Sequence, residues 1–350
     1  MNVAAASAKA PPSGSTPAPL AKTRFDWIPL LLVAAVMLAA LPLIGSPSTW
    51  VTLTVAGLAM GLIVFIIASG LTLVFGLMDV LNFGHGVFIA TGAYLTTSVM
   101  SRLGALTGGG SLPQALLAIA LAVIVAMVIA ALLGWFFERV IVRPVYGQHL
   151  KQILITLGGA IVGEEIIKMI WGPLQIPLPL PDALRGSFIV PVFGDGAAIA
   201  RFRVLAVVIG LVVFAALTYV LARTKVGLLV RAGVQDREMV ESLGYRVRRL
   251  FVGVFVVASA LAALGGVLWG LYQENVFPQI GAQVNILLFI VIIIGGLGST
   301  LGCFVGALLV GLMANYTGFL APKVALFSNI ALMVAILVWR PRGLYPVGGK

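Results

Sequence analysis

The sequence predicts an all-α fold, a polytopic membrane helical bundle with eight to ten spanning segments. Of the 350 residues, 61% are hydrophobic and 9% are charged, which is too little polar surface for a soluble globule of this length. The apolar residues form continuous runs such as IPLLLVAAVMLAALPLI, close to the length that crosses about 30 Å of hydrocarbon. These runs lack the apolar/polar alternation of barrel strands, so internally hydrogen-bonded helices are the spanning elements expected in lipid.

Residues 1–26 are rich in Ala, Pro and Ser and are predicted to form a disordered cytoplasmic N-terminus. The apolar segment 27–45 follows, with Lys22 and Arg24 just before it. A cleaved signal peptide is the competing interpretation of this pattern. The segment is longer than the usual signal core, so we interpret it as the first spanning helix.

The spanning domain is predicted to cover residues 27–340. Eight apolar segments are long enough to cross the bilayer, or nearly so: 27–45, 51–77, 86–101, 115–137, 153–171, 202–222, 250–272 and 325–340. The remaining apolar stretch, 283–320, is interrupted by Gly295, Gly296, Gly298 and Gly302. It forms either two short spans or a re-entrant pair, and both options return the chain to the same side. Broken or re-entrant helices are therefore expected near 295–302 and, for similar reasons, near 79–86.

The basic residues predict the orientation. With the N-terminus in the cytoplasm, 16 of the 22 Lys and Arg residues fall on the inner side, as the positive-inside rule requires. The inner segments include a loop at 223–249 and a cytoplasmic tail at 341–350. This dispersed pattern argues against nucleic-acid binding, which would need a basic stripe on a polar domain. A bacterial inner-membrane location with both termini cytoplasmic is expected.

The largest outer loop, 172–201, is expected to be stiff and irregular. It contains five prolines, at Pro173, Pro177, Pro179, Pro181 and Pro191. The loop is either a simple connector or part of a docking surface for an external partner.

The sequence contains few residues that could form a disulfide, bind a metal or act as catalysts. The one cysteine, Cys303, lies in an apolar run, and His85 and His149 are far apart, so no disulfide, metal site or catalytic dyad is expected. The chain contains no GxxxxGK[ST] phosphate loop. We therefore expect neither an enzyme nor a bound cofactor.

Two groups of polar residues inside apolar runs are candidate pathway residues. Asn82 and His85, beside Gly84 and Gly86, would either face a translocation pathway or clamp the backbone of a helix break, and helix packing alone is the alternative. In 153–171, charges at Glu164, Glu165 and Lys168 would each cost about 2.5 to 3.5 kcal/mol if isolated in lipid. Glu164 can pair with Lys168 four residues on. This leaves Glu165 to face the bundle interior or an aqueous vestibule. The alternative is that the three charges form a purely structural network with no role in the pathway.

The inner loop predicts a short helix across the inner membrane face. Asp236 fits the N-cap, while Glu238, Met239 and Glu241 occupy the first turns, where acidic side chains favour the positive end of the dipole. Gly244 fits the C-terminal stop.

This short helix carries a resemblance to a known family. The residues Gln235-Asp236-Arg237-Glu238-Met239, followed by Ser242-Leu243-Gly244, resemble the coupling loop of ABC importer permeases, in particular the LivH-type permeases of branched-chain amino acid transporters. Four further stretches are similar to that family: NFGHGVFIATGAY, ERVIVRPVYG, GGLGSTLGCFVGALLVGL and the closing RPRGLYP. The chain departs from the pattern in its long N-terminus and at Gly84, where the family more often has alanine.

The resemblance implies a function and a set of partners. A chain of this kind would be the permease subunit of an ATP-driven importer of branched-chain amino acids, and related permeases carry urea or short amides. Its partners would be a second related permease subunit, cytoplasmic ATP-binding cassette subunits and an extracytoplasmic solute-binding protein.

A second class of transporter remains open from the residues alone. An ion-coupled secondary transporter would use Glu164, Glu165, Asp79 and His85 as proton or cation sites. An uncoupler would stop such uptake while ATP remains, whereas an ATP-driven importer predicts the reverse.

Overall fold

The computed structural model describes residues 26–346, except Asp79, Leu81, Gly109, Phe193, Gly194 and Asp236. The predicted disordered segment 1–26 therefore lies outside the described residues apart from Asp26, as do the last four residues of the tail.

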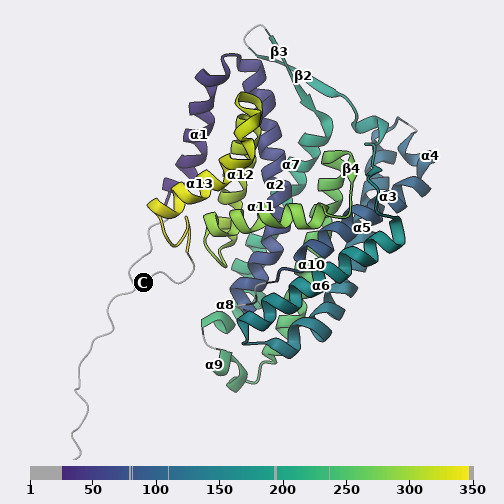
Figure 1. The fold of residues 1–350 in the computed structure, drawn as a ribbon. Coiled ribbons are helices and arrows are strands. Elements are labelled where there is room, and N and C mark those ends of the chain that lie inside the picture. Colours follow the sequence, from purple (N-terminus) through teal and green to yellow (C-terminus); the bar gives the residue numbers. More distant parts are fainter. Residues whose placement is uncertain are drawn as a thin grey trace, which may run out of the picture.

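The described chain is a bundle of helices with two small β ladders (Figure 1). The helices are α1 Ile28–Ile44, α2 Pro47–Met78, α3 His85–Arg102, α4 Gly104–Thr107, α5 Leu112–Phe137, α6 His149–Trp171, α7 Arg201–Arg223, α8 Lys225–Gln235, α9 Arg237–Ser242, α10 Val247–Gln273, α11 Ile280–Gly295, α12 Thr300–Leu320 and α13 Ala325–Trp339. A π-helical turn, Glu138–Val142, continues α5, and short 3-10 turns lie at Arg143–Val145, Asp182–Leu184 and Pro322–Val324. The strands are β1 Ile176–Pro177, β2 Ser187–Val192, β3 Asp195–Ala200 and β4 Asn275–Val276.

The helical membrane bundle is confirmed at the level of fold class, and the exact number of spans stays a prediction. Within the described residues, five helical stretches are long and apolar enough to cross a membrane: Pro47–Gly76, Leu112–Val145, Arg201–Arg223, Val247–Gln273 and Thr300–Leu320. Three shorter apolar helices occur at Ile28–Ile44, Ile280–Gly295 and Phe327–Trp339. The helices α3 and α6 occupy the two remaining segments predicted to span.

Close helix crossings build the core around α2. The centre of α2, from Leu62 to Ala68, is buried, and Gly57 and Gly61 of α2 meet α12 backbone to backbone. A Cβ atom added to Gly61 would lie 2.6 Å from the carbonyl oxygen of Ala307, and one added to Gly311 would lie 2.3 Å from that of Gly57. Small residues are what allow such approach between helices in lipid, where burial alone provides little attraction.

The glycines at 295–302 form a turn and a crossing. Gly296 and Gly298 have φ of +96° and +79°, which reverses the chain between α11 and α12. Gly295 and Gly302 then meet closely, with 2.0 Å between an added Gly302 Cβ and the Gly295 oxygen. In Figure 1, α11 lies across the bundle instead of running alongside α12. The predicted break is therefore a turn that joins an oblique helix to an upright one.

The two ends of the described chain meet at this turn. Arg340 Nη1 lies 2.6 Å from Asp26 Oδ2, and the Tyr345 hydroxyl donates to the Asp26 carbonyl oxygen. The hydrogen bond from Arg340 holds the pKa of the Asp26 carboxyl below its usual range. The ends of the described chain therefore share one side of the bundle.

The outer loop is not irregular as expected. Strands β2 and β3 pair antiparallel from Ser187↔Ala200 to Val192↔Asp195, and β1 pairs with β4 after α10. Pro191 is tolerated because a two-stranded ribbon leaves each strand an unpaired edge. This hairpin and the α8–α9 segment lie at opposite ends of the molecule (Figure 1).

We expect Gly311→Leu to lower stability strongly, by about 1 to 3 kcal/mol or more, because the new side chain must push α12 away from the α2 backbone. The measurement is the apparent melting temperature of the purified protein in mild detergent. Gly318→Leu, on the same helix with nothing within 4 Å of an added Cβ, is the matched control and should melt like the wild type. Equal melting of both variants would contradict the α2–α12 crossing.

Candidate functional site

The break between α2 and α3 is held by one of its own side chains and by side chains from α6 and α11. The Asn82 side-chain oxygen accepts from the Gly84 N–H at 3.0 Å. Asn285 Nδ2 of α11 donates to the Phe83 carbonyl at 3.1 Å, and the Phe83 N–H donates to Thr156 Oγ1 of α6 at 3.3 Å. These bonds satisfy backbone groups that the interrupted helix leaves unpaired, which is how irregular backbone is tolerated at membrane depth.

His85 links the same break to α2. It begins α3 and is buried, with its Nε2 3.2 Å from the carbonyl oxygen of Ile67. Asn82 is fully buried as well. Both side chains thus clamp backbone, one of the two arrangements that the sequence predicts for them, and a role for either in the pathway stays a prediction.

Close packing explains the two glycines of this segment. A Cβ atom on Gly84 would lie 2.5 Å from Cζ of Phe137, so the alanine that is commoner in the family would have to displace this ring. A Cβ on Gly86 would lie 2.7 Å from the carbonyl oxygen of Gly281. The chain therefore brings α11 directly against the start of α3.

The charges of α6 form one network, in which Glu165 does not occupy the bundle interior, one of its two predicted positions, and its place in an aqueous vestibule stays a prediction. Lys168 Nζ lies 2.9 Å from Glu164 Oε1 and 2.8 Å from Glu165 Oε1. The Glu165 side chain is 63% exposed, against 26% for Glu164, so Glu164 and not Glu165 faces the bundle interior. Lysine reaches carboxylates at both three and four residues back, so pairing with Glu164 does not leave Glu165 without a partner.

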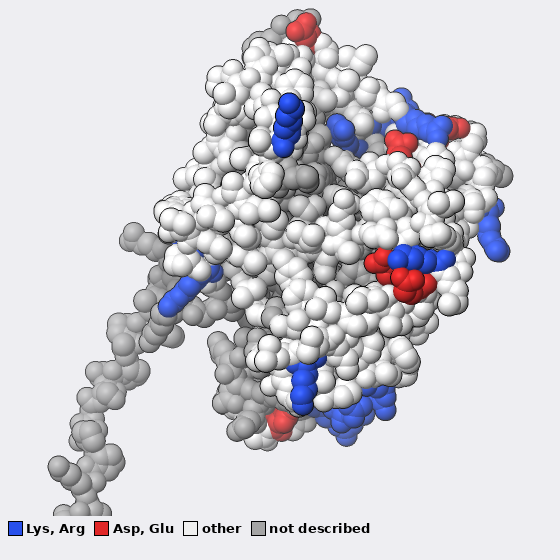
Figure 2. Space-filling model, viewed as in Figure 1, with Lys and Arg blue, Asp and Glu red and all other residues white. Residues whose placement is uncertain are grey.

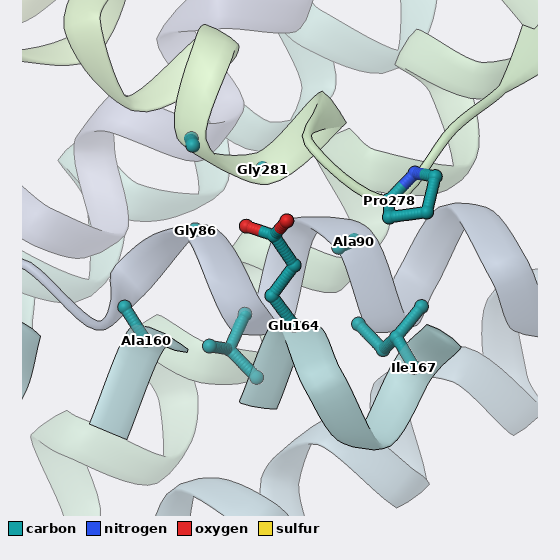
Figure 3. A pocket seen from close by; sticks show the side chains of 9 residues that line it. Gly86, Ala90, Ala160, Glu164, Ile167, Pro278 and Gly281 are labelled. Carbon is teal, nitrogen blue, oxygen red and sulfur yellow. The ribbon is translucent and has the colours of Figure 1, made fainter. Parts of the chain in front are cut away.

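Glu164 lines a small cavity between α3, α6 and the start of α11. Figure 3 shows its carboxylate toward the helices that carry Gly86 and Gly281, with Pro278 nearby. Gln279 Nε2 donates to the same carboxylate at 3.0 Å. The cavity holds only about 40 Å³, room for about one water molecule and not for an amino acid.

A larger cavity, of about 430 Å³, lies where α10, α11 and α13 meet. Its walls combine Val284, Leu287 and Ile290 with uncharged polar side chains. Those polar residues are Trp269, Tyr272, Gln273, Gln283 and Asn329. No charged residue lines it, and its size falls in the range of small-molecule sites, roughly 300 to 1,000 Å³.

The sequence analysis did not identify these residues. They are single polar side chains scattered over three apolar helices, so only the helix arrangement brings them together. The one feature of the sequence that could have indicated them is their position, because they lie at the end of α10 and near the starts of α11 and α13.

The α8–α9 segment has the form that the sequence predicts. Helix α9 ends as Gly244 adopts φ of +85°, and the Gly244 N–H bonds to the Glu241 oxygen at 3.0 Å. Val240 is buried against the bundle, whereas Met239 and Leu243 are 53% and 68% exposed. Asp236 lies outside the described residues, and the side chains of Gln235 and Glu238 are not described. Their coupling role stays a prediction.

Helix α10 joins this segment to the larger cavity. Its first residue, Val247, is buried near α9, and its last turns carry Trp269, Tyr272 and Gln273 in the cavity wall. A continuous helix with one end at a polar surface segment and the other at an uncharged cavity among the apolar helices is the organisation expected of a membrane transport protein.

The comparisons with known proteins identify the family. A family profile described as "Branched-chain amino acid transport system / permease component" matches residues 53–339. The chain therefore belongs to this family of transport permeases.

Relatives agree with this assignment. The chain is 29% identical over 299 residues to the high-affinity branched-chain amino acid transport system permease protein BraD of Pseudomonas aeruginosa, covering 83% of this chain and 94% of the relative. It is 27% identical over 291 residues to the corresponding permease LivH of Salmonella typhimurium, covering 82% and 92%. It is also 27% identical over 333 residues to LivM of Escherichia coli, covering 91% and 75%. No solved structure matches the chain.

We expect Lys168→Met to reduce the amount of folded protein in membranes, because it leaves two neighbouring carboxylates without their cation. The triple variant Lys168→Met, Glu164→Gln, Glu165→Gln should recover most of the loss. Detergent-extracted yield and melting temperature provide the readout, and a wild-type result for Lys168→Met alone would contradict a stabilising network.

Proposed function

We propose that this chain is the permease subunit of an ATP-driven ABC importer that moves branched-chain amino acids across the cytoplasmic membrane. The observation that carries the proposal is the family match over most of the spanning region. Two relatives that match this chain over more than nine-tenths of their own length are named as permeases of branched-chain amino acid transport systems. The solute is not altered chemically, and ATP is hydrolysed on separate subunits.

The partners follow from the same relationship. Similarity to both LivH and LivM supports pairing with a second, related permease chain. Cytoplasmic ATP-binding cassette subunits dock on the α8–α9 segment, and an extracytoplasmic binding protein delivers the solute at the end that carries the β2–β3 hairpin. Both termini lie in the cytoplasm.

The charge distribution supports this orientation. In Figure 2, basic side chains form a dense group at the lower end of the molecule, while those in the upper part are scattered and some lie beside acidic ones. The residues near α9 include Arg246, Arg248 and Arg249, which are exposed. Cytoplasmic ends of spanning helices carry such an excess of Lys and Arg.

The larger cavity supports an aliphatic solute. Val284, Leu287 and Ile290 offer contacts for a branched side chain, while amide, hydroxyl and indole groups can solvate a zwitterion of zero net charge. Urea and short amides, the alternative substrates, would leave the apolar wall without a partner. Closure of the ATP-binding subunits would push α9 and, through α10, change the shape of this cavity.

An ion-coupled secondary transporter is the other alternative. Glu164 is bonded to Lys168 and Gln279, and His85 to a backbone carbonyl, so neither is a free proton site in this conformation. Glu165 is bonded to Lys168 as well, and Asp79, the fourth candidate, lies outside the described residues. Uptake that continues with an uncoupler but stops on ATP depletion supports the importer, and the reverse result supports ion coupling.

We expect the double variant Met239→Asp, Leu243→Asp to lose its ATP-binding cassette subunit on co-purification. Both side chains are exposed on the predicted docking segment, and buried carboxylates without a partner would weaken binding by tenfold or more, about 1.4 kcal/mol per tenfold. The control, Ile189→Asp, alters a side chain that is 76% exposed at the opposite end and should retain the subunit. Equal retention by both variants would remove the support for coupling at α9.

We expect Ala314→Phe to lower uptake of leucine, isoleucine and valine by about tenfold or more, because the ring fills part of the cavity. Association with the ATP-binding subunits should be unchanged. Gly318→Phe, one turn further along α12 where nothing lies within 4 Å of an added Cβ, is the matched control. Normal uptake by Ala314→Phe would show that the solute does not use this cavity.

A further inference from the structure

A basic pocket lies beside the α8–α9 segment and takes no part in the proposed transport path. It is formed by the end of α5, the turn after it and the start of α10, and its volume is about 580 Å³. Four arginines line it against one acidic residue, Glu241. The arginines are Arg139, Arg246, Arg248 and Arg249. The pocket therefore concentrates positive charge in a concave surface.

The guanidinium groups are available for an anion. All four arginines are exposed, and within the part of the chain that the structure describes none of them forms an ion pair. The nearby carboxylate of Glu138 is buried and accepts a hydrogen bond from the Tyr146 hydroxyl at 2.6 Å, so it does not line the pocket. Guanidinium groups bind phosphate oxygens through paired hydrogen bonds.

The pocket continues into an apolar stripe on α5. Ile124, Val128, Leu132 and Trp135 are 57%, 54%, 63% and 49% exposed, and their spacing of three and four residues places them on one face of the helix. Arg139 follows four residues after Trp135, and both line the pocket. From Ile124 to Trp135 this stripe is about 16 Å long at 1.5 Å per residue. That length matches one leaflet of a bilayer whose hydrocarbon core is about 30 Å thick.

We propose that this pocket binds the phosphate headgroup of an anionic phospholipid, whose acyl chain lies along the α5 stripe. A soluble anion would use the arginines but not the stripe, and a protein docked from the cytoplasm could not cover a stripe that extends through a leaflet. Basic pockets at the cytoplasmic ends of spanning helices bind such headgroups. Because the proposal concerns lipid and not solute, it holds for any substrate of the transporter.

Because of its position, a lipid in this pocket would affect how movement of the ATP-binding subunit is transmitted through α9 to α10. Glu241 belongs to α9 and Arg246 immediately precedes α10, on either side of Gly244. Arg139 follows α5. A headgroup bound to Arg139 and Arg246 therefore ties the joint between α9 and α10 to α5, and it holds α9 in place for the ATP-binding subunit.

The test measures retained lipid on the full-length protein. Wild type and the variant Arg139→Gln, Arg246→Gln are reconstituted in nanodiscs of phosphatidylcholine mixed with phosphatidylglycerol, re-extracted in mild detergent, and analysed by native mass spectrometry. The expected result is preferential retention of phosphatidylglycerol by the wild type and at least a tenfold weaker retention by the variant. Arg102→Gln, Lys323→Gln removes the same charge at the opposite end and should behave like the wild type.

Several outcomes would overturn the proposal. One is equal retention of the two lipids by the wild type, and another is equal retention of phosphatidylglycerol by the wild type and the pocket variant. If soluble glycerophosphoglycerol displaces the lipid at similar concentration, the site recognises a free phosphate and not a membrane lipid. If the pocket variant keeps its lipid but loses the ATP-binding subunit, the arginines belong to the protein interface. A melting temperature close to that of the wild type shows that the variant is folded.

Discussion

The fold depends on pairing every polar backbone group inside a medium that offers no water. Continuous helices meet this requirement by themselves, but the chain breaks between α2 and α3, and the break is stable because Asn82, Thr156 and Asn285 supply its hydrogen bonds. These side chains come from the break itself, α6 and α11. The same bonds therefore fix where α6 and α11 sit, and with them the cavities on either side of α11.

Helix α11 is the element that this constraint positions most directly. Gly86 and Gly281 let it approach the start of α3, and Gly295 and Gly302 let it approach α12. An oblique helix held at both ends leaves space beside it toward α10 and α13, which is where the uncharged cavity forms. The arrangement connects a local sequence feature, small residues at helix crossings, with an uncharged cavity of a size that could hold a small solute.

The sequence predicts well where each helix lies along the chain, but poorly which face of a helix is turned toward the rest of the bundle. The apolar runs locate the helices to within a few residues, and the glycine stop after α9 follows from local backbone chemistry alone. Of the two positions that the sequence left open for Glu165, the bundle interior was wrong, because adjacent helical residues differ by about 100° in direction and the apolar residues of α6 surround the helix without marking one face. The cavity was not foreseen because its polar residues are separated by long stretches of chain. The β2–β3 hairpin was not foreseen because Pro191 lies within it and four further prolines precede it in the same loop.

The meeting of the chain ends has a consequence for how the protein is made. The N–H groups of Leu344 and Tyr345 bond to the carbonyl oxygens of Ile294 and Gly295, each at 2.9 Å, and Arg340 reaches back to Asp26. The carbonyl groups that end α11 therefore find their hydrogen-bond partners only in residues that follow α13. These contacts cannot form before α13 has been synthesised and has reached its place, and a chain shortened before Arg340 would lack both the hydrogen bonds to α11 and the ion pair with Asp26.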